Sequence, residues 1–258
     1  MELLREKLLK AAQNDEDRLL LSRIADAVYL ADKQGREKFT PFLGSRIYEA
    51  VSAILTKSGT PFSAFGGYEG AERQMLCFGC YEDEQPDYPI TPLEITGRDT
   101  DQLGHRDILG ALMSLGIKRE TVGDIFRADN FMIMAEHSIA GYLTMELCRI
   151  GKYSVECREF TGGVITPPEK QFKEIKGTVA SVRLDAVVAL MAGVSRSEAA
   201  ALVSGGRVVL NGLPDTHPSR TLSDGDKISA RGYGKAELKI FGQSKKGRQH
   251  ITLLKYIN

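Results

Sequence analysis

Residues 183–212 read RLDAVVALMAGVSRSEAAALVSGGRVVLNG, and this stretch decides the fold of the C-terminal part of the chain. Its first half carries apolar side chains at helical spacing, at Leu184, Val187, Val188 and Met191. This spacing predicts a helix with one apolar face. Gly193 follows shortly after, and a glycine there ends the helix because it adopts a positive φ at little cost.

A second short helix is expected directly after the first. Ser195 and Glu198 have the spacing of a capping box, in which each side chain bonds the backbone N–H of the other residue. Gly205-Gly206 ends this helix. Residues 208–210 then indicate a strand, and Asn211-Gly212 indicates a turn. The stretch therefore predicts two short helices followed by a strand and a tight turn.

Three arginines flank these helices. Arg183 precedes the first helix, Arg196 opens the second, and Arg207 follows it. None of them lies on the apolar stripe, so each is expected to face solvent or a ligand. The helix start at Ser195 offers backbone N–H groups that favour a phosphate. A plain solvated surface is the alternative, since groups of charged residues often have no other role.

The order of these features resembles the S4 RNA-binding domain, from about Val182 to Lys235. The resemblance implies an S4 (αL) fold that grips structured RNA. It also implies that Arg183, Arg196 and Arg207 contact phosphates, with Ser195 adding a contact from the helix start. Arginine suits this role because its planar guanidinium can bond a phosphate through two N–H groups at once.

The balance of charge differs along the chain. Overall, 34 basic residues stand against 34 acidic ones, so the net charge is zero. From Lys176 onward there are 13 Lys and Arg against 6 Asp and Glu, and the preceding part is acidic. A basic unit attached to an acidic body is typical of an appended nucleic-acid-binding module. The neutral total argues against indiscriminate coating of RNA, and we expect no DNA partner.

Signals for a membrane or for secretion are missing from the sequence. No apolar run approaches 18 residues, and the first ten residues indicate a charged amphipathic helix. Cys77 and Cys80 form a C-x-x-C pair, but Cys148 and Cys157 do not form a second one. We therefore expect a cytoplasmic protein with no membrane partner, reduced cysteines, no metal and no cofactor. A zinc site at the C-x-x-C pair is the alternative.

The rest of the chain divides into a helical N-terminal domain, residues 1–70, and a middle domain, residues 71–165. The main N-terminal helix is expected to be capped by Asn14 or Asp15. Its apolar side chains are expected mainly on one side of the helix; they are Leu19, Leu20, Ile24, Val28 and Leu30. Gly162-Gly163, Pro167-Pro168 and then residues 170–176 indicate a linker, which leaves residues 176–258 as the S4 domain of an α+β protein.

The middle domain alternates strands and helices. An extra strand, residues 75–81, is expected at its start. The elements after it are strand 93–96, helix 104–115, strand 123–127, strand 131–135, helix 138–150 and strand 153–160. Strand, helix, strand, strand, helix, strand is the order of a ferredoxin-like (βαββαβ) fold.

RNA-recognition domains share this fold and stack bases on aromatic side chains of the sheet. Phe126 and Phe131 lie on the central strands here, but the K/R-G-F/Y-G/A-F signature of those domains is missing. Apolar residues of strands usually belong to a core. We therefore interpret both phenylalanines as core residues, with base stacking as the alternative.

Five further motifs occur in the body of the chain. They are Phe39-Thr40-Pro41-Phe42-Leu43, Gly66-Gly67-Tyr68-Glu69-Gly70-Ala71-Glu72-Arg73, His105-Arg106-Asp107-Ile108-Leu109-Gly110, Leu115-Gly116-Ile117-Lys118-Arg119-Glu120 and Gly123-Asp124-Ile125. Together with the C-terminal stretch they resemble the YlmH family of bacterial S4-domain proteins over nearly the whole chain. The resemblance implies a non-catalytic RNA-binding protein whose partners are rRNA, tRNA and the large ribosomal subunit. It links the protein to translation quality control or to cell division.

Two motifs raise the question of an enzyme. His105-Arg106-Asp107 resembles a kinase catalytic loop, but the Gly-rich loop and the Asp-Phe-Gly motif are missing, so we expect these residues to cap a helix. Gly97-Arg98-Asp99-Thr100 resembles the nucleophile motif of S4 pseudouridine synthases but lacks its leucine. An S4-containing RNA-modifying enzyme is the alternative function, and a scaffold for division proteins is a third.

A last basic group consists of Lys245, Lys246 and Arg248. It is expected at the tip of a hairpin between residues 238–241 and residues 250–254. These side chains extend the RNA-binding surface or simply keep the tip soluble. We favour the first interpretation.

Overall fold

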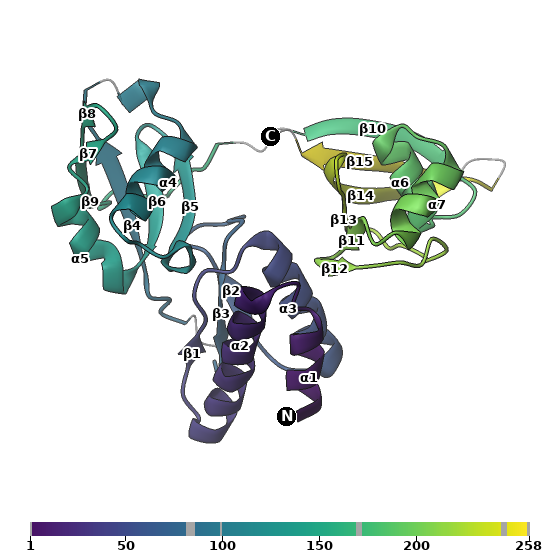
Figure 1. Cartoon of the computed structure of the whole chain (residues 1–258), viewed down its shortest axis with the longest axis horizontal. Helices are drawn as coiled ribbons and strands as arrows, with labels where there is room; N and C mark the ends of the chain where they lie inside the picture. Colours follow the sequence, from purple (N-terminus) through teal and green to yellow (C-terminus); the bar gives the residue numbers. More distant parts are fainter. Residues whose placement is uncertain (1, 81–85, 99, 169–171, 244–246, 257–258) are drawn as a thin grey trace. The chain divides into compact units, whose positions relative to one another are not determined.

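The computed structural model describes residues 2–80, 86–98, 100–168, 172–243 and 247–256 (Figure 1). The chain separates into two compact units, and the first of them ends at Pro168. Helices and antiparallel sheets occur in both units, so the predicted α+β class is confirmed.

Three helices form the N-terminal part of the first unit: α1 (Glu2–Lys10), α2 (Asp15–Gln34) and α3 (Ser45–Ser58). The Asn14 side chain accepts a hydrogen bond from the backbone N–H of Asp17, which confirms one of the two predicted caps of α2. The apolar side chains that α2 buries are Leu21, Ile24, Ala25, Val28 and Ala31. The predicted place of Leu19 and Leu30 on this face is wrong: both are exposed, because a period of 3.6 residues puts them on the other side.

A small antiparallel sheet accompanies these helices. Its strands β1 (Lys38–Phe39), β2 (Ser63–Phe65) and β3 (Met75–Phe78) lie in the order β1-β3-β2, and every residue of β3 is buried. The strand β3 was predicted as part of the middle domain, residues 71–165. It belongs with the N-terminal helices instead, because both strands that bond to it come from the N-terminal segment.

Cys77 of β3 and the nearby Cys80 form a disulfide bond, so the prediction that both are reduced is wrong. Between them Gly79 has a φ of 78°, which turns the chain just after the strand ends. This turn brings the second sulfur back to the first. The other two cysteines are free; Cys148 is exposed and Cys157 is buried.

The middle of the chain forms a four-stranded antiparallel sheet with two helices. In chain order its elements are β4 (Ile90–Thr96), α4 (His105–Ser114), β5 (Val122–Arg127), β6 (Phe131–Glu136), α5 (His137–Glu146) and β9 (Glu156–Glu159). Two short 3₁₀ helices, η1 (Thr100–Gln102) and η2 (Arg119–Thr121), precede α4 and β5. The sheet order β5-β6-β4-β9 places the first and third strands side by side at the centre, as in the predicted ferredoxin-like fold.

The second helix of this sheet domain is shorter than the sequence predicted. The helix expected over residues 138–150 ends at Glu146. Just beyond it, β7 (Arg149–Ile150) turns back to pair with β8 (Tyr153–Ser154). The pairing of these strands replaces the last helical turn, so the predicted helix end is wrong.

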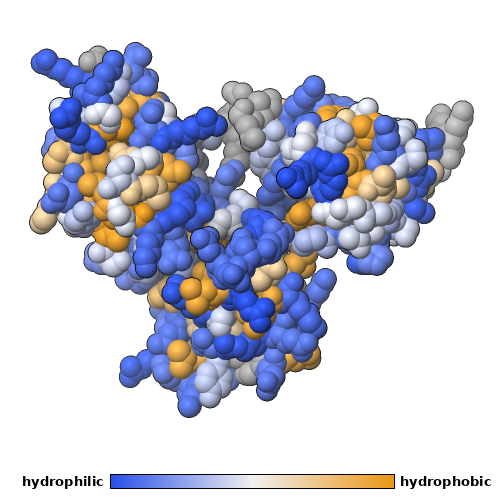
Figure 2. All heavy atoms as spheres, viewed as in Figure 1, coloured by the Kyte–Doolittle hydropathy of each residue, from blue (hydrophilic) through white to orange (hydrophobic). Residues whose placement is uncertain are grey.

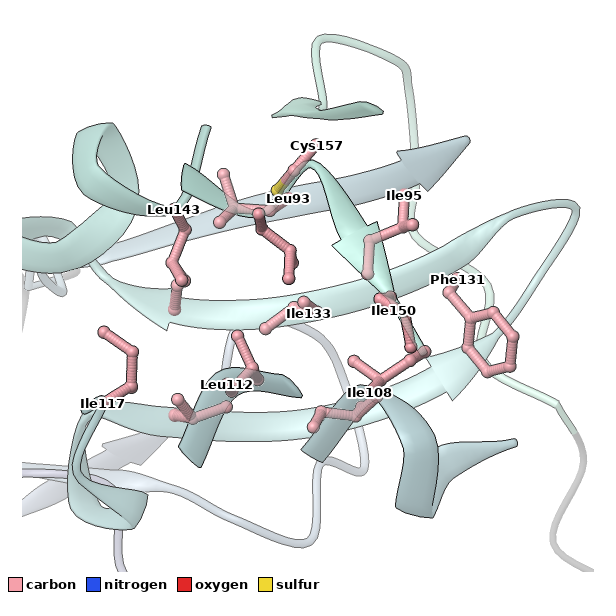
Figure 3. Close-up of a cluster of buried hydrophobic side chains, with 14 of the residues drawn as sticks. Leu93, Ile95, Ile108, Leu112, Ile117, Phe131, Ile133, Leu143, Ile150 and Cys157 are labelled. Carbon is pink, nitrogen blue, oxygen red and sulfur yellow. The ribbon is translucent and has the colours of Figure 1, made fainter. Parts of the chain in front are cut away.

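Both helices pack on one face of the sheet (Figure 3). The strands contribute Leu93, Ile95, Phe131 and Ile133, and the helices contribute Ile108, Leu112 and Leu143. Phe131 is 5% exposed, which confirms its predicted place in the core.

The opposite face of the sheet is covered as well. Successive strand residues point to opposite faces, so Met132 and Met134 point away from the helices. They pack against Phe42 and Met75 of the N-terminal part, and all four side chains are buried. Phe126 packs against this cluster, in agreement with its predicted core role. The face that RNA-recognition domains use for base stacking is therefore filled here by the protein's own side chains.

The second unit combines two short helices with a six-stranded antiparallel sheet in the order β10-β15-β14-β13-β11-β12. The strands are β10 (Phe172–Val179), β11 (Val208–Leu210), β12 (Leu213–Pro214), β13 (Lys227–Ala230), β14 (Gly234–Gln243) and β15 (Gln249–Tyr256). The helices α6 (Leu184–Ala192) and α7 (Arg196–Ser204) meet at an angle of 112°.

The local features predicted for residues 183–212 are present. The predicted apolar stripe of α6, which consists of Leu184, Val187, Val188 and Met191, is buried against the sheet. Gly193 ends α6 with a φ of 68°. Asn211 and Gly212 have φ values of 48° and 78°, as a two-residue hairpin turn requires.

One strand of the second unit lies where a linker was expected. Residues 170–176 were predicted as linker, but β10 begins at Phe172 and pairs with β15 along its whole length. Because its first three residues are exposed, their sequence lacks the apolar alternation of a half-buried strand. The partner strand β15 supplies the hydrogen bonds that stabilise it.

No single helix in the described ranges is long and apolar enough to cross a membrane, although α6 and α7 taken together have sufficient length and composition. Their apolar residues contribute to the core of the second unit. Figure 2 shows hydrophilic side chains over most of the face in view, with hydrophobic ones in small separate areas.

Replacing Gly123 by Ala tests the packing between the middle sheet and the N-terminal part. A Cβ atom at this residue would lie 2.6 Å from the ring of Phe42 and 2.9 Å from Cβ of Met134. Because the site has no room, we expect G123A to destabilise the first unit by about 1–3 kcal/mol in urea denaturation. The control is G141A in α5, where the added Cβ meets nothing and helix propensity predicts an unchanged or slightly raised stability. Equal stability of the two variants would contradict the close packing at Gly123.

Candidate nucleic-acid interface

Arg183 lies at the N-terminal end of α6 and donates hydrogen bonds to Asp185. It occupies the N-cap position, in extended conformation. Its Nε and Nη2 atoms donate to the two carboxylate oxygens of Asp185 at 3.2 and 3.0 Å. The guanidinium is therefore held at the helix start, and its side chain is 37% exposed.

Arg196 reaches the same carboxylate from the next helix. It is the first residue of α7, and its Nε and Nη2 atoms lie 3.2 and 3.3 Å from the oxygens of Asp185. Asp185 itself is only 4% exposed, whereas the Arg196 side chain is 54% exposed. One buried carboxylate thus fixes two exposed guanidinium groups side by side, and we call Arg183 and Arg196 the arginine pair.

The arginine pair retains a positive charge and free bonding capacity toward a ligand. Two guanidinium groups and one carboxylate leave one net positive charge. Each guanidinium has five N–H donors, of which two point at Asp185. Burial raises the pKa of Asp185, but the hydrogen bonds from Arg196 and Arg183 outweigh this effect and hold the pKa below its usual value. The carboxylate is therefore charged at neutral pH.

Ser195 is engaged at the start of α7. Its hydroxyl accepts from the backbone N–H of Glu198, and its own N–H donates to the Glu198 carboxylate at 2.9 Å, as the predicted capping box requires. Hydrogen bonds from Ser195 lower the pKa of Glu198, so a negative charge lies at this helix start. That charge disfavours a phosphate, and the geometry does not support the predicted contact at Ser195.

Two of the remaining predicted residues, Arg207 and Arg248, lie within the described part of the chain. Arg207 is exposed and lies three residues beyond the C-terminal end of α7, whereas Arg196 is the first residue of this helix. Arg248 donates from Nη2 to the carbonyl of Thr178 at 2.8 Å, at the end of β10 from which the chain continues to Arg183. Lys245 and Lys246 lie outside the described residues.

Arg183 and Arg196 were predicted from the sequence as site residues, whereas the role of Asp185 in holding them was not. The carboxylate was visible only as an acidic residue in the first turn of a helix, a common position with favourable dipole interactions. Its burial and its second partner depend on how α7 folds back on α6. The Arg-x-Asp spacing at the helix start was the available signal.

Motif residues of the first unit meet around Asp124. Its carboxylate accepts from the hydroxyl of Tyr68 at 2.6 Å and from the backbone N–H groups of Glu72 and Arg73 at 2.7 and 3.1 Å. Burial and the hydrogen bond to Asp124 raise the pKa of Tyr68. These bonds tie the glycine-rich loop to β5, so this motif serves the junction between the N-terminal part and the sheet.

Two arginines at this junction point inward. Arg73 donates to the backbone carbonyls of Phe42, Val122 and Arg119, and burial beside Arg119 lowers its pKa to about 10. Arg119 donates to the carbonyls of Val122 and Gly123. Both guanidinium groups are thus used by the fold.

The motif that resembles a kinase loop has a capping role, as expected. The Asp107 carboxylate accepts from the backbone N–H of Gly104 at 2.8 Å at the start of α4. Burial and the nearby Arg119 lower the pKa of His105. Asp99 lies outside the described residues.

Acid should weaken the interaction that holds the arginine pair. Because the pKa of Asp185 is lower in the folded chain than in the unfolded one, its contribution is complete at neutral pH and is lost as the pH falls below about 4. We expect D185N to lower the unfolding free energy of the second unit by about 2 kcal/mol at pH 7. Thermal unfolding from pH 7 to pH 3 should show this difference shrinking as wild-type Asp185 becomes protonated. A difference independent of pH would mean that the substitution acts through packing alone.

Comparisons with known proteins identify similar families, one curated relative and one solved structure. Residues 83–162 match the family described as "Putative RNA-binding domain in YlmH", and residues 182–228 match the S4 domain. The chain is 30% identical over 242 residues to the "Ribosome-associated protein quality control protein P2" of Bacillus subtilis (strain 168), covering 92% of this chain and 94% of that protein. The solved structure titled "Cell division protein ylmH from Streptococcus pneumoniae" is similar with a TM-score of 0.47 at 24% identity, over 58% of this chain and 93% of that one. Because the relative in Bacillus subtilis is 30% identical over 92% of this chain, and residues 83–162 match the YlmH domain, the chain belongs to the YlmH family of S4-domain proteins.

Proposed function

We propose that this protein is a non-catalytic RNA-binding protein that associates with the ribosome through its C-terminal S4 unit. The observation that carries the proposal is the arginine pair, two exposed guanidinium groups fixed by the buried Asp185. Groups fixed in advance lose little conformational freedom when they bind a ligand. A planar guanidinium bonds a phosphate through two N–H groups, so the pair suits the backbone of a folded RNA.

Further cations of the same unit are expected to extend the contact. Arg207 is exposed beyond α7, and Arg248 directly precedes β15. We propose that both follow the sugar-phosphate chain and position the unit on it, without reading base identity. Lys245 and Lys246 belong to the same proposal on sequence grounds alone.

The proposed partner is ribosomal RNA of the large subunit, with tRNA as a second one. Support comes from the relative in Bacillus subtilis, whose name describes a ribosome-associated protein of quality control. The two matched domain families, one an S4 domain and one described as RNA-binding, fit the same partner. Ribosomes lie in the cytoplasm, and we propose that compartment for this protein. Translation quality control is the role that we favour over a link to cell division.

A catalytic role lacks support among the described residues. The chemically suggestive groups of the first unit, Asp107 and Asp124, accept backbone hydrogen bonds at a helix start and at a loop. Arg73 and Arg119 bond backbone carbonyls. Each of these residues already has a place in the fold, so we propose binding and not chemistry on RNA.

Removing the arginine pair tests the proposal directly. We expect the R183A/R196A double variant to bind large-subunit rRNA about a hundredfold more weakly, since each substitution removes a charged hydrogen-bonding group. The slope of log affinity against log salt should flatten by about two, as expected for two lost phosphate contacts. The control is K176Q, which removes one charge from the exposed strand β10, where Lys176 pairs with Glu174. An unchanged salt slope in the double variant would refute the phosphate role.

Truncation separates this function from that of a division-protein scaffold. A chain ending at Pro168, the boundary of the first compact unit, should no longer sediment with ribosomes in a sucrose gradient. The expectation follows because the arginine pair lies in the removed unit. Full retention of ribosome association by the truncated chain would contradict binding through the S4 unit and would assign it to the first unit.

A further inference from the structure

A second buried carboxylate in the C-terminal unit, that of Asp215, bonds an arginine and a histidine. Asp215 is 8% exposed and accepts from Nε of Arg220 and from the backbone N–H of His217, each at 2.8 Å. The Nδ1 atom of His217 lies 3.2 Å from the same carboxylate. The Arg220 and His217 side chains are 52% and 73% exposed. An arginine and a histidine are thus fixed from behind and presented to solvent.

The loop that carries these residues, loop 215–221, is bonded to the segment of the arginine pair. Arg183 forms a β-bridge with Thr221, and the backbone N–H of Leu184 donates to the carbonyl of Arg220 at 2.9 Å. These are main-chain contacts between directly adjacent segments. Loop 215–221 therefore lies beside the segment that carries Arg183.

Loop 215–221 also borders an open pocket with the hydrogen-bond donors that an anion requires. His217, Ser219, Arg220 and Thr221 line an open pocket of about 380 Å³. Its walls offer a guanidinium, an imidazole and two hydroxyl groups, and no carboxylate is among the lining residues. Asp215, the acidic residue of the loop, is buried and bonded to Arg220 and His217.

Asp215 is charged at neutral pH and so keeps Arg220 oriented. Burial raises its pKa, but hydrogen bonds from His217 and Arg220 outweigh burial and hold the pKa below its usual value. Only Nε of the Arg220 guanidinium bonds this carboxylate. Its Nη groups are the donors that a ligand in the pocket would meet.

We propose that the pocket of loop 215–221 binds a second phosphate of the RNA strand that the arginine pair binds. Arg220 supplies the charge, and Ser219 and Thr221 supply hydroxyl hydrogen bonds. The assignment rests on the proposed RNA-binding function and extends it to a segment outside the two helices. RNA is the favoured source of the phosphate because the neighbouring arginine pair is suited to the same backbone chemistry.

The test compares three full-length variants, each with a net charge lower by one, in binding to purified large-subunit rRNA across a salt series. R220Q removes the guanidinium from the pocket, and S219E places a carboxylate in the pocket from an exposed residue. The matched control K176Q changes charge on β10, away from loop 215–221 in the chain. We expect R220Q and S219E to weaken binding about tenfold. R220Q should also reduce the salt slope by about one, whereas K176Q should change affinity less than twofold.

The outcomes separate the pocket from the proposed function. One outcome would overturn only the proposed phosphate site in the pocket. In it, wild type binds the rRNA and R183A/R196A does not, but R220Q and S219E bind as well as K176Q does. No binding by wild type, or full binding by R183A/R196A, would overturn the proposed function and the pocket with it. Circular dichroism checks that each variant is folded. If R220Q is unfolded, S219E decides, because Ser219 is exposed and its replacement leaves the bond between Arg220 and Asp215 in place.

Discussion

The carboxylate of Asp185 orders the face of the second unit for which we propose RNA binding. It lies buried between two helices and accepts hydrogen bonds from Arg183 and Arg196. Without it, two flexible cationic side chains at neighbouring helix starts would repel each other. With it, they are fixed in one place and still carry a net positive charge. Because Asp185 bonds residues of both helices, the packing of α6 against α7 sets the position of the two guanidinium groups that we propose to bind phosphate.

The two units differ in how they use their arginines and their sheet faces. In the first unit, the sheet face that RNA-recognition domains leave open is filled by Met132, Met134, Phe42 and Met75. Its motif residues around Asp124 are used to join the N-terminal part to the sheet. In the second unit, Arg196 and Arg220 are exposed, and the carboxylates that bond them, Asp185 and Asp215, are buried. This contrast is the reason for assigning phosphate binding to the second unit.

Much of the candidate interface was predictable because its elements are local in sequence. The capping box of Ser195 and the turn at Asn211 depend on residues within a few positions of each other. Arg183 and Arg196 were identified by their absence from the apolar stripe and by resemblance to the S4 domain. The phosphate contact expected at Ser195 is a different case, since the same capping box that the sequence predicted brings the charge of Glu198 to the helix start.

Local sequence alone predicted the βαββαβ order of the middle domain, the helix pair α6 and α7 with the apolar face of α6, and the resemblance to the family. These follow from periodicity and short motifs, which act over one or two helical turns. Only the tertiary structure decided that β3 joins the N-terminal sheet, that β10 pairs with β15, and that Asp185 and Asp215 are buried beneath their cations. The physical reason is that strand pairing and the burial of a charge depend on partners distant in the chain, and local sequence does not specify which distant partner a residue meets.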